Sequence, residues 1–392
     1  MNERLMDSEV ASCELSDDER RLIAAEIERF ARGSVSPLVE RPELVLSQQK
    51  LDNLTEQAQD IGLLSLDEVS GVGLWEQGDA PPSLSVELLT SIAKVNAGVA
   101  LHFHQYSLAR YLIGVLGFPA ETVEMIEQTA ISLTGYYGLG GAALPRYLLS
   151  QGEEGGDIDF LRCWFDGDNS TPFVFTASAT WQTLLHPSID SDGSLIFSLY
   201  SRQDLVVDEM TNSHGFDELS AFCCQGFGGV KPLSVSSLTQ KQSKEIYSLV
   251  LQYNALAYMA IALGAVQHAY EIASDYSAIR EQGGAVINRH SAVQLLLAEQ
   301  RSAIDGVTIS LEHLSSKRLS LETISTVFSI RATSHKTLCN AANAAMQSCG
   351  GIGYMQDTGL EKIVRDCNAL RVTDGTPMEL SLFIAEWERL HG

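Results

Sequence analysis

The periodicity of the chain changes twice along its length, and this order of patterns constrains the fold more than any other feature. About the first 130 residues carry apolar side chains at helical spacing. From residue 131 to about 241, short β-branched or aromatic runs alternate with turn residues. Helical spacing returns near residue 243 and continues to the end. This order differs from the βαβ alternation of a dinucleotide-binding sheet, so we expect a helical domain (1–130), a β domain (131–241) and a helical domain (242–392).

The same patterns predict individual elements. Turn signals at Asp166-Gly167 and Asp192-Gly193 are typical of hairpins. The predicted strands are 130–134, 160–165, 172–176, 194–200 and 230–235. The predicted helices are 14–33, 46–63, 84–96, 99–117, 120–130, 243–282, 287–315, 320–348, 360–370 and 377–390.

Charge and hydropathy narrow the class of protein. The formal net charge of −24 argues against nucleic acid or an anionic membrane as a partner. No apolar run reaches the ~18–20 residues that a membrane span needs. The longest run, 256–266, is expected to be a buried helix. The acidic N-terminus shows no apolar signal core, so no targeting peptide is expected.

Cysteine and histidine usage gives two further expectations. Seven cysteines, including the adjacent pair Cys223 and Cys224, form no Cys-x-x-Cys spacing and no disulfide framework, which favours a cytoplasmic location. His102 and His104 lie two positions apart on a helical pattern and therefore face apart. No metal site is expected, and core or surface positions are the simpler interpretation of these histidines.

The segment around Asp374 is the most informative short stretch. Thr376 is a good N-cap, Pro377 suits the first helical position, and Glu379 completes a capping box. Asp374 is thus predicted to sit on a Gly-flanked turn just before a helix N-terminus. A solvated turn carboxylate is the simplest interpretation, and a base beside a phosphate-bearing cofactor is the functional one.

Two earlier segments belong with this turn. Tyr276 to Ile287 contains Arg280 at the end of a long helix, followed by the Gly283-Gly284 break. Gln347 to Tyr354 places a glycine cluster after another helix, where backbone can approach a ligand closely. Each segment alone is weak evidence for a site.

Together, in this order and spacing, the three segments resemble the acyl-CoA dehydrogenase family over about residues 254–392. The family pattern is Tyr…Arg-x-x-Phe-Gly, then Gln-x-x-Gly-Gly-x-Gly-Tyr, then Arg-Asp followed by a Glu-Gly-Thr turn. The resemblance implies a mainly α chain with an N-terminal helical domain, a middle β-barrel and a C-terminal four-helix bundle. It also implies FAD-dependent α,β-dehydrogenation of an acyl-CoA or acyl-carrier thioester, the β-hydride passing to flavin N5. An electron-transfer flavoprotein or similar acceptor and a homo-oligomer, tetramer or dimer, are the implied partners.

The resemblance assigns roles residue by residue. Asp374 takes the position of the base that removes the α-proton, and Thr376 lies on the flavin side of it. Arg280 is expected to reach the FAD of a neighbouring subunit. The remaining FAD contacts are expected from Thr134 and Thr176 at the isoalloxazine and from Gln347, Gly350 and Gly351 at the adenine end.

Several positions depart from the family pattern. Asp374 replaces the usual Glu, and Gly283 replaces the Phe that follows the Arg motif. After Thr134 the family's Glu-Pro-x-Ala-Gly-Ser-Asp is replaced by residues 135–141, with Gly140 where the pyrophosphate-binding Ser stands. Two alternatives therefore stay open. One is a flavin monooxygenase on the same fold, and the other is a non-catalytic subunit paired with an active homologue.

Overall fold

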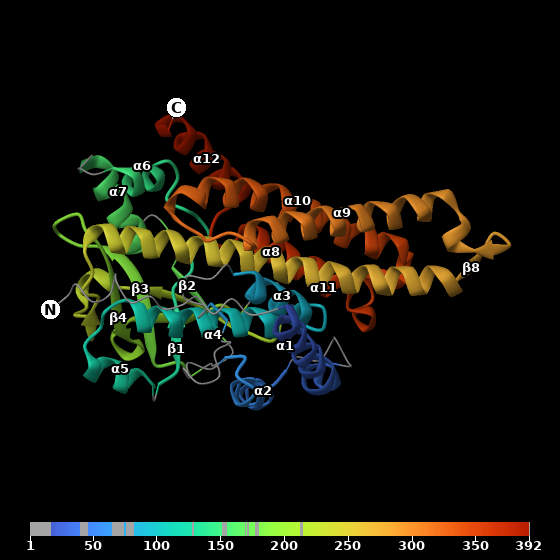
Figure 1. The fold of residues 1–392 in the computed structure, drawn as a ribbon, viewed down its shortest axis with the longest axis horizontal. Helices are drawn as coiled ribbons and strands as arrows, with labels where there is room; N and C mark the ends of the chain where they lie inside the picture. Colours follow the sequence, from blue (N-terminus) through green and yellow to red (C-terminus); the bar gives the residue numbers. More distant parts are fainter. Residues whose placement is uncertain are drawn as a thin grey trace.

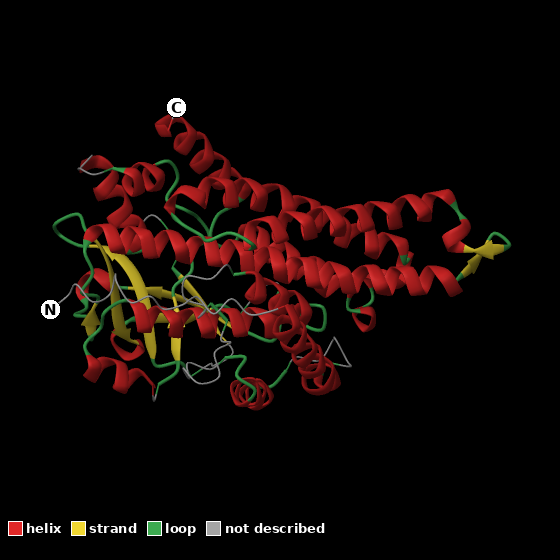
Figure 2. Ribbon diagram, in the orientation of Figure 1, coloured by secondary structure: helices red, strands yellow, loops and turns green. Residues whose placement is uncertain are grey.

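The computed structural model describes residues 17–39, 46–64, 74–75, 82–127, 129–150, 155–168, 170, 172–176, 180–211 and 215–391. Its long axis follows the C-terminal helices, and the strands gather beside one half of that axis (Figures 1 and 2). The arrangement confirms a mainly helical chain with a central β domain.

Within the described residues, five α-helices precede the strands. They are α1 (Asp17–Phe30), α2 (Gln48–Asp60), α3 (Ser83–Ala93), α4 (Ala97–Val115) and α5 (Ala120–Glu127). The α4 helix starts at Asn96, whose side chain accepts a hydrogen bond from the Val99 N–H at 2.9 Å. Most faces of α4 are buried, because it lies between α3, α8 and the first strand.

The β domain contains two small sheets. One has the order β1 (Ile131–Leu133), β3 (Thr183–Ile189), β4 (Leu195–Ser201), β7 (Ser234–Val235), and the other the order β2 (Phe173–Thr176), β6 (Ser220–Gln225), β5 (Val206–Glu209). The β1–β3 pair is parallel and the other pairs are antiparallel. The predicted turn at 192–193 is confirmed, since Gly193 adopts φ +81 between β3 and β4.

Two helices interrupt the β domain, α6 (Ala143–Leu149) and α7 (Gly155–Phe165). The predicted strand at 160–165 is therefore wrong. Leu161, Trp164 and Phe165 recur at helical spacing and are all buried, so a helix buries one continuous face. Gly167, at φ +95, follows the end of α7 and does not close a hairpin.

The C-terminal domain is a bundle of long helices. It comprises α8 (Gln240–Ile279), α9 (Ser291–Ser315), α10 (Ile324–Ser348), α11 (Leu360–Val372) and α12 (Pro377–His391). A hairpin of β8 (Glu281–Gln282) and β9 (Ala285–Val286) joins α8 to α9 at the end of the molecule farthest from the strands (Figure 1). Among the described helices, α8 alone is long and apolar enough to cross a membrane, but 94% of its apolar window is buried inside the fold.

Candidate functional site

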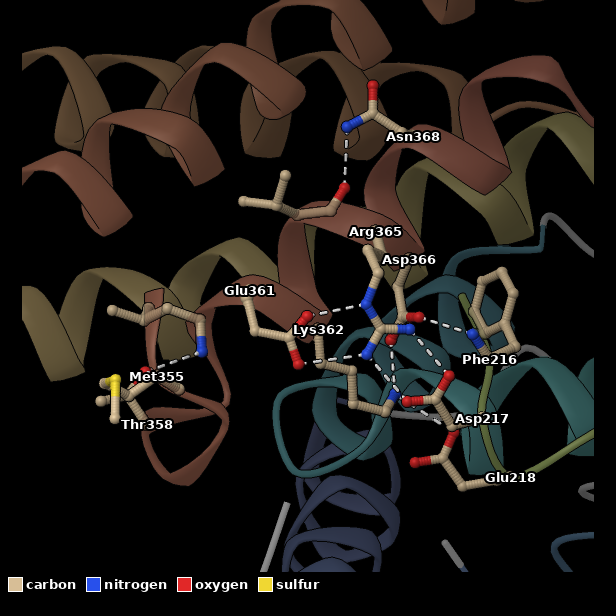
Figure 3. A network of polar contacts seen from close by, with 12 residues as sticks. Phe216, Asp217, Glu218, Met355, Thr358, Glu361, Lys362, Arg365, Asp366 and Asn368 are labelled. Carbon is tan, nitrogen blue, oxygen red and sulfur yellow. Dashed lines mark hydrogen bonds and ion pairs between the residues drawn. The ribbon is translucent and has the colours of Figure 1, made fainter. Parts of the chain in front are cut away.

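The α11 helix carries the turn with Asp374 at its C-terminal end, and charged side chains fix this helix to the β domain (Figure 3). Arg365 donates to both carboxylate oxygens of Asp217 at 2.7 and 2.8 Å. It also donates to Glu361, one helical turn earlier. These contacts tie α11 to the segment between β5 and β6.

A second, buried cluster lies beside the first (Figure 3). The Lys362 ammonium is 2.5 Å from Asp366 and 3.1 Å from Glu218. Glu218 also accepts a hydrogen bond from Asn96, the N-cap of α4, at 2.7 Å. Burial alone lowers the pKa of Lys362, but the two carboxylates outweigh it, so the pKa is raised and the lysine stays charged.

The turn after α11 has left-handed backbone at two consecutive residues. Asp374 adopts φ +47 and Gly375 adopts φ +119. A Cβ on Gly375 would lie 2.8 Å from Leu139, so the turn and the 135–141 loop are closely packed. Arg331 of α10 fixes the turn by donating to the carbonyls of Thr373 and Asp374.

The Asp374 carboxylate has three protein donors. The Tyr136 N–H donates to Oδ1 at 2.9 Å, and the Asn254 amide and Tyr258 hydroxyl donate to Oδ2 at 2.8 and 2.7 Å. Asp374 as a whole is only 5% exposed. Burial raises the pKa of Asp374, while its donors and the nearby Arg331 charge oppose that rise. A carboxylate held in this way is stabilised as an internal acceptor.

A series of hydrogen bonds leads from Asp374 through Asn254 and His104 to Trp75. The indole N–H of Trp75 donates to His104 Nδ1 at 3.0 Å, so the His104 proton resides on Nε2. His104 Nε2 then donates to the Asn254 carbonyl at 3.0 Å. Burial lowers the pKa of His104 to about 4, which keeps the ring neutral and this proton arrangement intact. We call the chain Trp75–His104–Asn254–Asp374 the buried polar chain.

The 135–141 loop, where the resemblance places cofactor phosphate, is paired with the turn before α12. The Asp374 N–H donates to the Tyr136 carbonyl at 2.6 Å, opposite the bond from the Tyr136 N–H to Asp374 Oδ1. The Leu139 N–H donates to the Glu379 carboxylate at 3.0 Å. Two backbone donors of the loop, the Tyr136 and Leu139 N–H groups, are therefore occupied by carboxylates, whose charge repels phosphate. These two donors do not fit an FAD pyrophosphate at this loop.

The capping prediction around Thr376 holds in part. The Glu379 N–H donates to the Thr376 hydroxyl at 3.3 Å, as an N-cap requires. The Glu379 carboxylate, however, accepts from the Thr376 hydroxyl and from Leu139. The cap thus also serves as the bridge between α12 and the 135–141 loop.

The predicted isoalloxazine contacts lie on the β domain. Thr134 is buried after β1, where its hydroxyl donates to the Leu185 carbonyl at 3.3 Å and lies 3.2 Å from His186 Nδ1. Thr176, at the end of β2, lines a cavity of about 350 Å³. Neither Thr134 nor Asp374 lines that cavity.

The predicted adenine-side residues lie elsewhere in the bundle. Arg280 caps the C-terminus of α8 and is exposed, as are Gln347 in the last turn of α10 and Gly350 and Gly351 after it. Asn254 and Arg280 are 26 positions apart on the α8 path, which corresponds to about 39 Å at helical rise. That distance excludes a contact between Arg280 and Asp374 within one chain. Its expected role toward a neighbouring subunit stays a prediction.

Sequence reasoning missed most partners of Asp374. Tyr258 was visible only as a polar break in the apolar run 256–266, and Arg331 carried no motif at all. His104 is a core histidine, as expected, but it also belongs to the buried polar chain. The signal that could have found Tyr258 is its spacing from Asn254, because residues four apart share one helix face.

The family profile described as "Acyl-CoA dehydrogenase, C-terminal domain" matches residues 246–387. The chain is 26% identical over 139 residues to a 3-sulfinopropanoyl-CoA desulfinase of Paraburkholderia xenovorans (strain LB400), covering 35% of this chain and 36% of that protein. It is 32% identical over 133 residues to the mitochondrial very long-chain specific acyl-CoA dehydrogenase of Bos taurus, covering 32% and 20%. The matched region thus spans about a third or less of these relatives' length.

Solved structures share the whole fold at low identity. The prolyl acyl carrier protein oxidase AnaB superposes with a TM-score of 0.70 at 14% identity, covering 95% of this chain and 100% of that one. Butyryl-CoA dehydrogenase from Megasphaera elsdenii gives a TM-score of 0.68 at 16% identity, covering 96% and 99%.

The family comprises oxidoreductases that typically bind FAD, and the C-terminal motifs, the profile match and the shared fold agree with one another. Residues 246–387 of this chain are a divergent acyl-CoA dehydrogenase C-terminal domain, and the chain as a whole shares the fold of that family's solved structures.

Proposed function

We propose that this chain is a non-catalytic subunit of an acyl-CoA dehydrogenase-type enzyme that oxidises an acyl thioester, assembled with an active homologue. One observation carries the proposal: the side-chain carboxylate and the backbone N–H of Asp374 both form hydrogen bonds within the protein. Its carboxylate accepts three protein hydrogen bonds, and its N–H donates to Tyr136. A base needs a free acceptor aimed at the substrate, and a thioester carbonyl needs a free donor.

The far end of the bundle supports assembly with another chain. Ile279 beside Arg280 is 78% exposed, Leu295 on α9 is 71% exposed, and Tyr354 after α10 is 62% exposed. Large apolar side chains gathered near one end of a soluble protein mark a surface for association. In this proposal, the partner binds FAD and the acyl-CoA or acyl-carrier thioester. The partner also passes electrons to an electron-transfer flavoprotein or similar acceptor, and the assembly works in the cytoplasm.

The second candidate is a dehydrogenase in its own right, with Asp374 as the base. The retained carboxylate at the turn before α12 favours it, as does burial, which raises the pKa of Asp374 and makes the carboxylate a stronger base. This activity requires the 135–141 loop to leave Asp374 and Glu379. Thr134, Thr176, Arg280, Gln347, Gly350, Gly351 and Thr376 keep their predicted cofactor roles only in this candidate.

Anaerobic mixing separates the two candidates. The purified chain is supplied with FAD and titrated with acyl-CoAs of several chain lengths while the flavin absorbance is followed. The first candidate predicts no bleaching by any thioester. Bleaching that disappears in Asp374→Asn, but persists in a variant of an exposed acid such as Asp357→Asn, would establish the second.

A further inference from the structure

The 135–141 loop binds anions in this structure, and the chain itself supplies them. The Leu139 N–H donates to Glu379 Oε1 at 3.0 Å, and the Tyr136 N–H donates to Asp374 Oδ1 at 2.9 Å. Backbone N–H groups that hold a carboxylate have the chemistry that also holds a phosphate oxygen. Leu139 and Glu379 are 240 positions apart, so the fold rather than local chain geometry brings them together.

The Glu379 carboxylate lies between this loop and the N-terminus of α12. Its Oε1 accepts from Leu139, while its Oε2 accepts from the Thr376 hydroxyl at 3.1 Å. Thr376 directly precedes α12, a helix of 15 residues whose N-terminus favours negative charge. A side chain of α12 thus provides the anion for its own helix end and for the loop at once.

The loop packs closely around this carboxylate. A Cβ on Gly138 would lie 2.5 Å from Glu379 Oε1, so the contact depends on a residue without a side chain. The N–H groups of Gly138 and Gly141 form no hydrogen bond with any residue that the structure describes, and both glycines are half-buried. The loop therefore keeps donors beyond the two that the carboxylates occupy.

We propose, as an extension of the proposed subunit function, that Glu379 is an autoinhibitory substitute for phosphate at the 135–141 loop. Its carboxylate occupies the Leu139 N–H and the Thr376 hydroxyl, and its charge repels the pyrophosphate group of a dinucleotide. Removing the carboxylate leaves both donors without an acceptor, which is costly unless another acceptor binds. Glu379→Ala therefore converts the closed loop into a site for a pyrophosphate-bearing ligand.

Calorimetric titration with inorganic pyrophosphate tests the proposal, and the quenching of FAD fluorescence repeats the test with the dinucleotide. The original chain should show no saturable binding of pyrophosphate up to about 10 mM. Glu379→Ala should bind it with a dissociation constant of about 1 mM or less, at least about tenfold below that limit. Asp357→Ala removes one exposed acid elsewhere and should behave as the original chain does.

Gly138→Ala is a second variant, and it keeps the acid. The φ of Gly138 lies outside the left-handed region, so alanine fits its backbone, and the added Cβ displaces the flexible end of Glu379 from Leu139. Pyrophosphate binding should appear in this variant too, but more weakly than in Glu379→Ala, because the displaced charge stays nearby.

Urea unfolding establishes that each variant is folded before it is titrated. Absence of pyrophosphate binding in folded Glu379→Ala, or in Gly138→Ala if the first variant does not fold, would overturn the proposal. Saturable binding by the original chain, or an equal gain in Asp357→Ala, would also overturn it. The proposed subunit function fails on a different result, the bleaching of flavin on the original chain by an acyl-CoA, so the two failures are distinguishable.

Discussion

At the residue scale, Asp374 stands where the family resemblance expects the base, and its side chain is held by contacts inside the protein. Its φ of +47 is tolerated by Asp better than by most side chains, because a short polar side chain bonds locally. The contacts come from distant segments, since Tyr136 lies 238 positions away and Asn254 lies 120 away. Asp374 therefore joins the β domain, α8 and α10 at one point, because its carboxylate accepts from the first two and its backbone carbonyl accepts from Arg331 of α10.

Replacing Asp374 with Asn tests this environment. The variant removes the buried negative charge that balances Arg331 and presents an amide to groups that are themselves donors. The free energy of unfolding should fall by about 3–5 kcal/mol, as for one partner removed from a buried pair. Urea unfolding measures the loss, and Asp357→Asn, on the exposed surface, should change it by about 0.5 kcal/mol or less. A loss as small as that of the control would contradict the contacts described.

Buried neutral histidines give the fold a sensitivity to acid. Burial lowers the pKa of His102 and His104 to about 4 and that of His186 to about 3. The unfolded chain takes up these protons near pH 6.5, so below that pH the unfolded state binds more protons than the folded state. Stability is therefore complete above pH 6.5 and falls toward pH 4, by up to about 1.4 kcal/mol per pH unit for each histidine.

The variant His104→Gln isolates one of these histidines. Its unfolding free energy, measured from pH 7.5 to pH 4.5, should show a shallower decline than that of the original chain. Asp366 and Asp374 have raised pKa values and act in the opposite sense, so the comparison uses the difference between the two chains. Parallel pH curves would show that His104 takes up its proton equally in both states.

At the element scale, the helix pair α6 and α7 and the 135–141 loop set this chain apart. Arg146 of α6 bonds Asp157 of α7 at 2.6 Å and Glu386 of α12 at 2.9 Å. The 135–141 loop is thus bound to the turn before α12, and the α6–α7 pair that follows the loop is bound to Glu386 farther along α12. These contacts hold closed the place where the resemblance predicts cofactor phosphate.

Two neighbouring glycines of the loop form a matched test. Gly140 (φ +68) and Gly141 (φ +59) both have left-handed backbone, but only a Cβ on Gly140 meets an obstacle, Leu161 of α7 at 2.8 Å. Gly141→Ala should lower the free energy of unfolding by about 1 kcal/mol through backbone strain alone. Gly140→Ala should lower it by about 1–3 kcal/mol more through overpacking. Equal losses in chemical unfolding would contradict the close packing of the loop on α7.

The buried lysine of α11 gives a second test at this scale. Lys362→Met leaves Glu218 and Asp366 as uncompensated buried carboxylates, so stability should fall by about 3–5 kcal/mol. Arg365→Met removes a half-buried surface pair and should lower stability by about 1 kcal/mol or less. Thermal or urea unfolding of both variants measures the difference. A similar loss of unfolding free energy in Lys362→Met and Arg365→Met would show that the burial of Lys362 does not increase its contribution to stability.

The sequence predicted the elements better than their contacts. Spacing and caps located α8 to α12 within a few residues, because helices report their buried face locally. The interval 160–165 was predicted wrongly as a strand, since its aromatic residues fit both a strand and a buried helix face. The turn at Asp374 was predictable from Thr376 and Pro377. Its donors were not, because they come from segments with no local signal of their pairing.

At the scale of the whole molecule, the chain keeps the family's fold and its C-terminal motifs, while its 135–141 loop is hydrogen-bonded to Asp374 and Glu379. The exposed end of the bundle, with Ile279 and Tyr354, remains available for association. A chain with this fold, in which the Asp374 carboxylate and two loop N–H groups are engaged internally, fits the proposed subunit that shapes or supports a partner's site.

Flavin stoichiometry tests this central claim most directly. The chain, purified alone, is equilibrated with excess FAD and then dialysed, and the flavin absorbance retained per chain is measured. The account predicts no stoichiometric flavin, because the 135–141 loop presents carboxylates where phosphate needs donors. One FAD retained per chain, released by Arg280→Ala or bleached by an acyl-CoA, would contradict it.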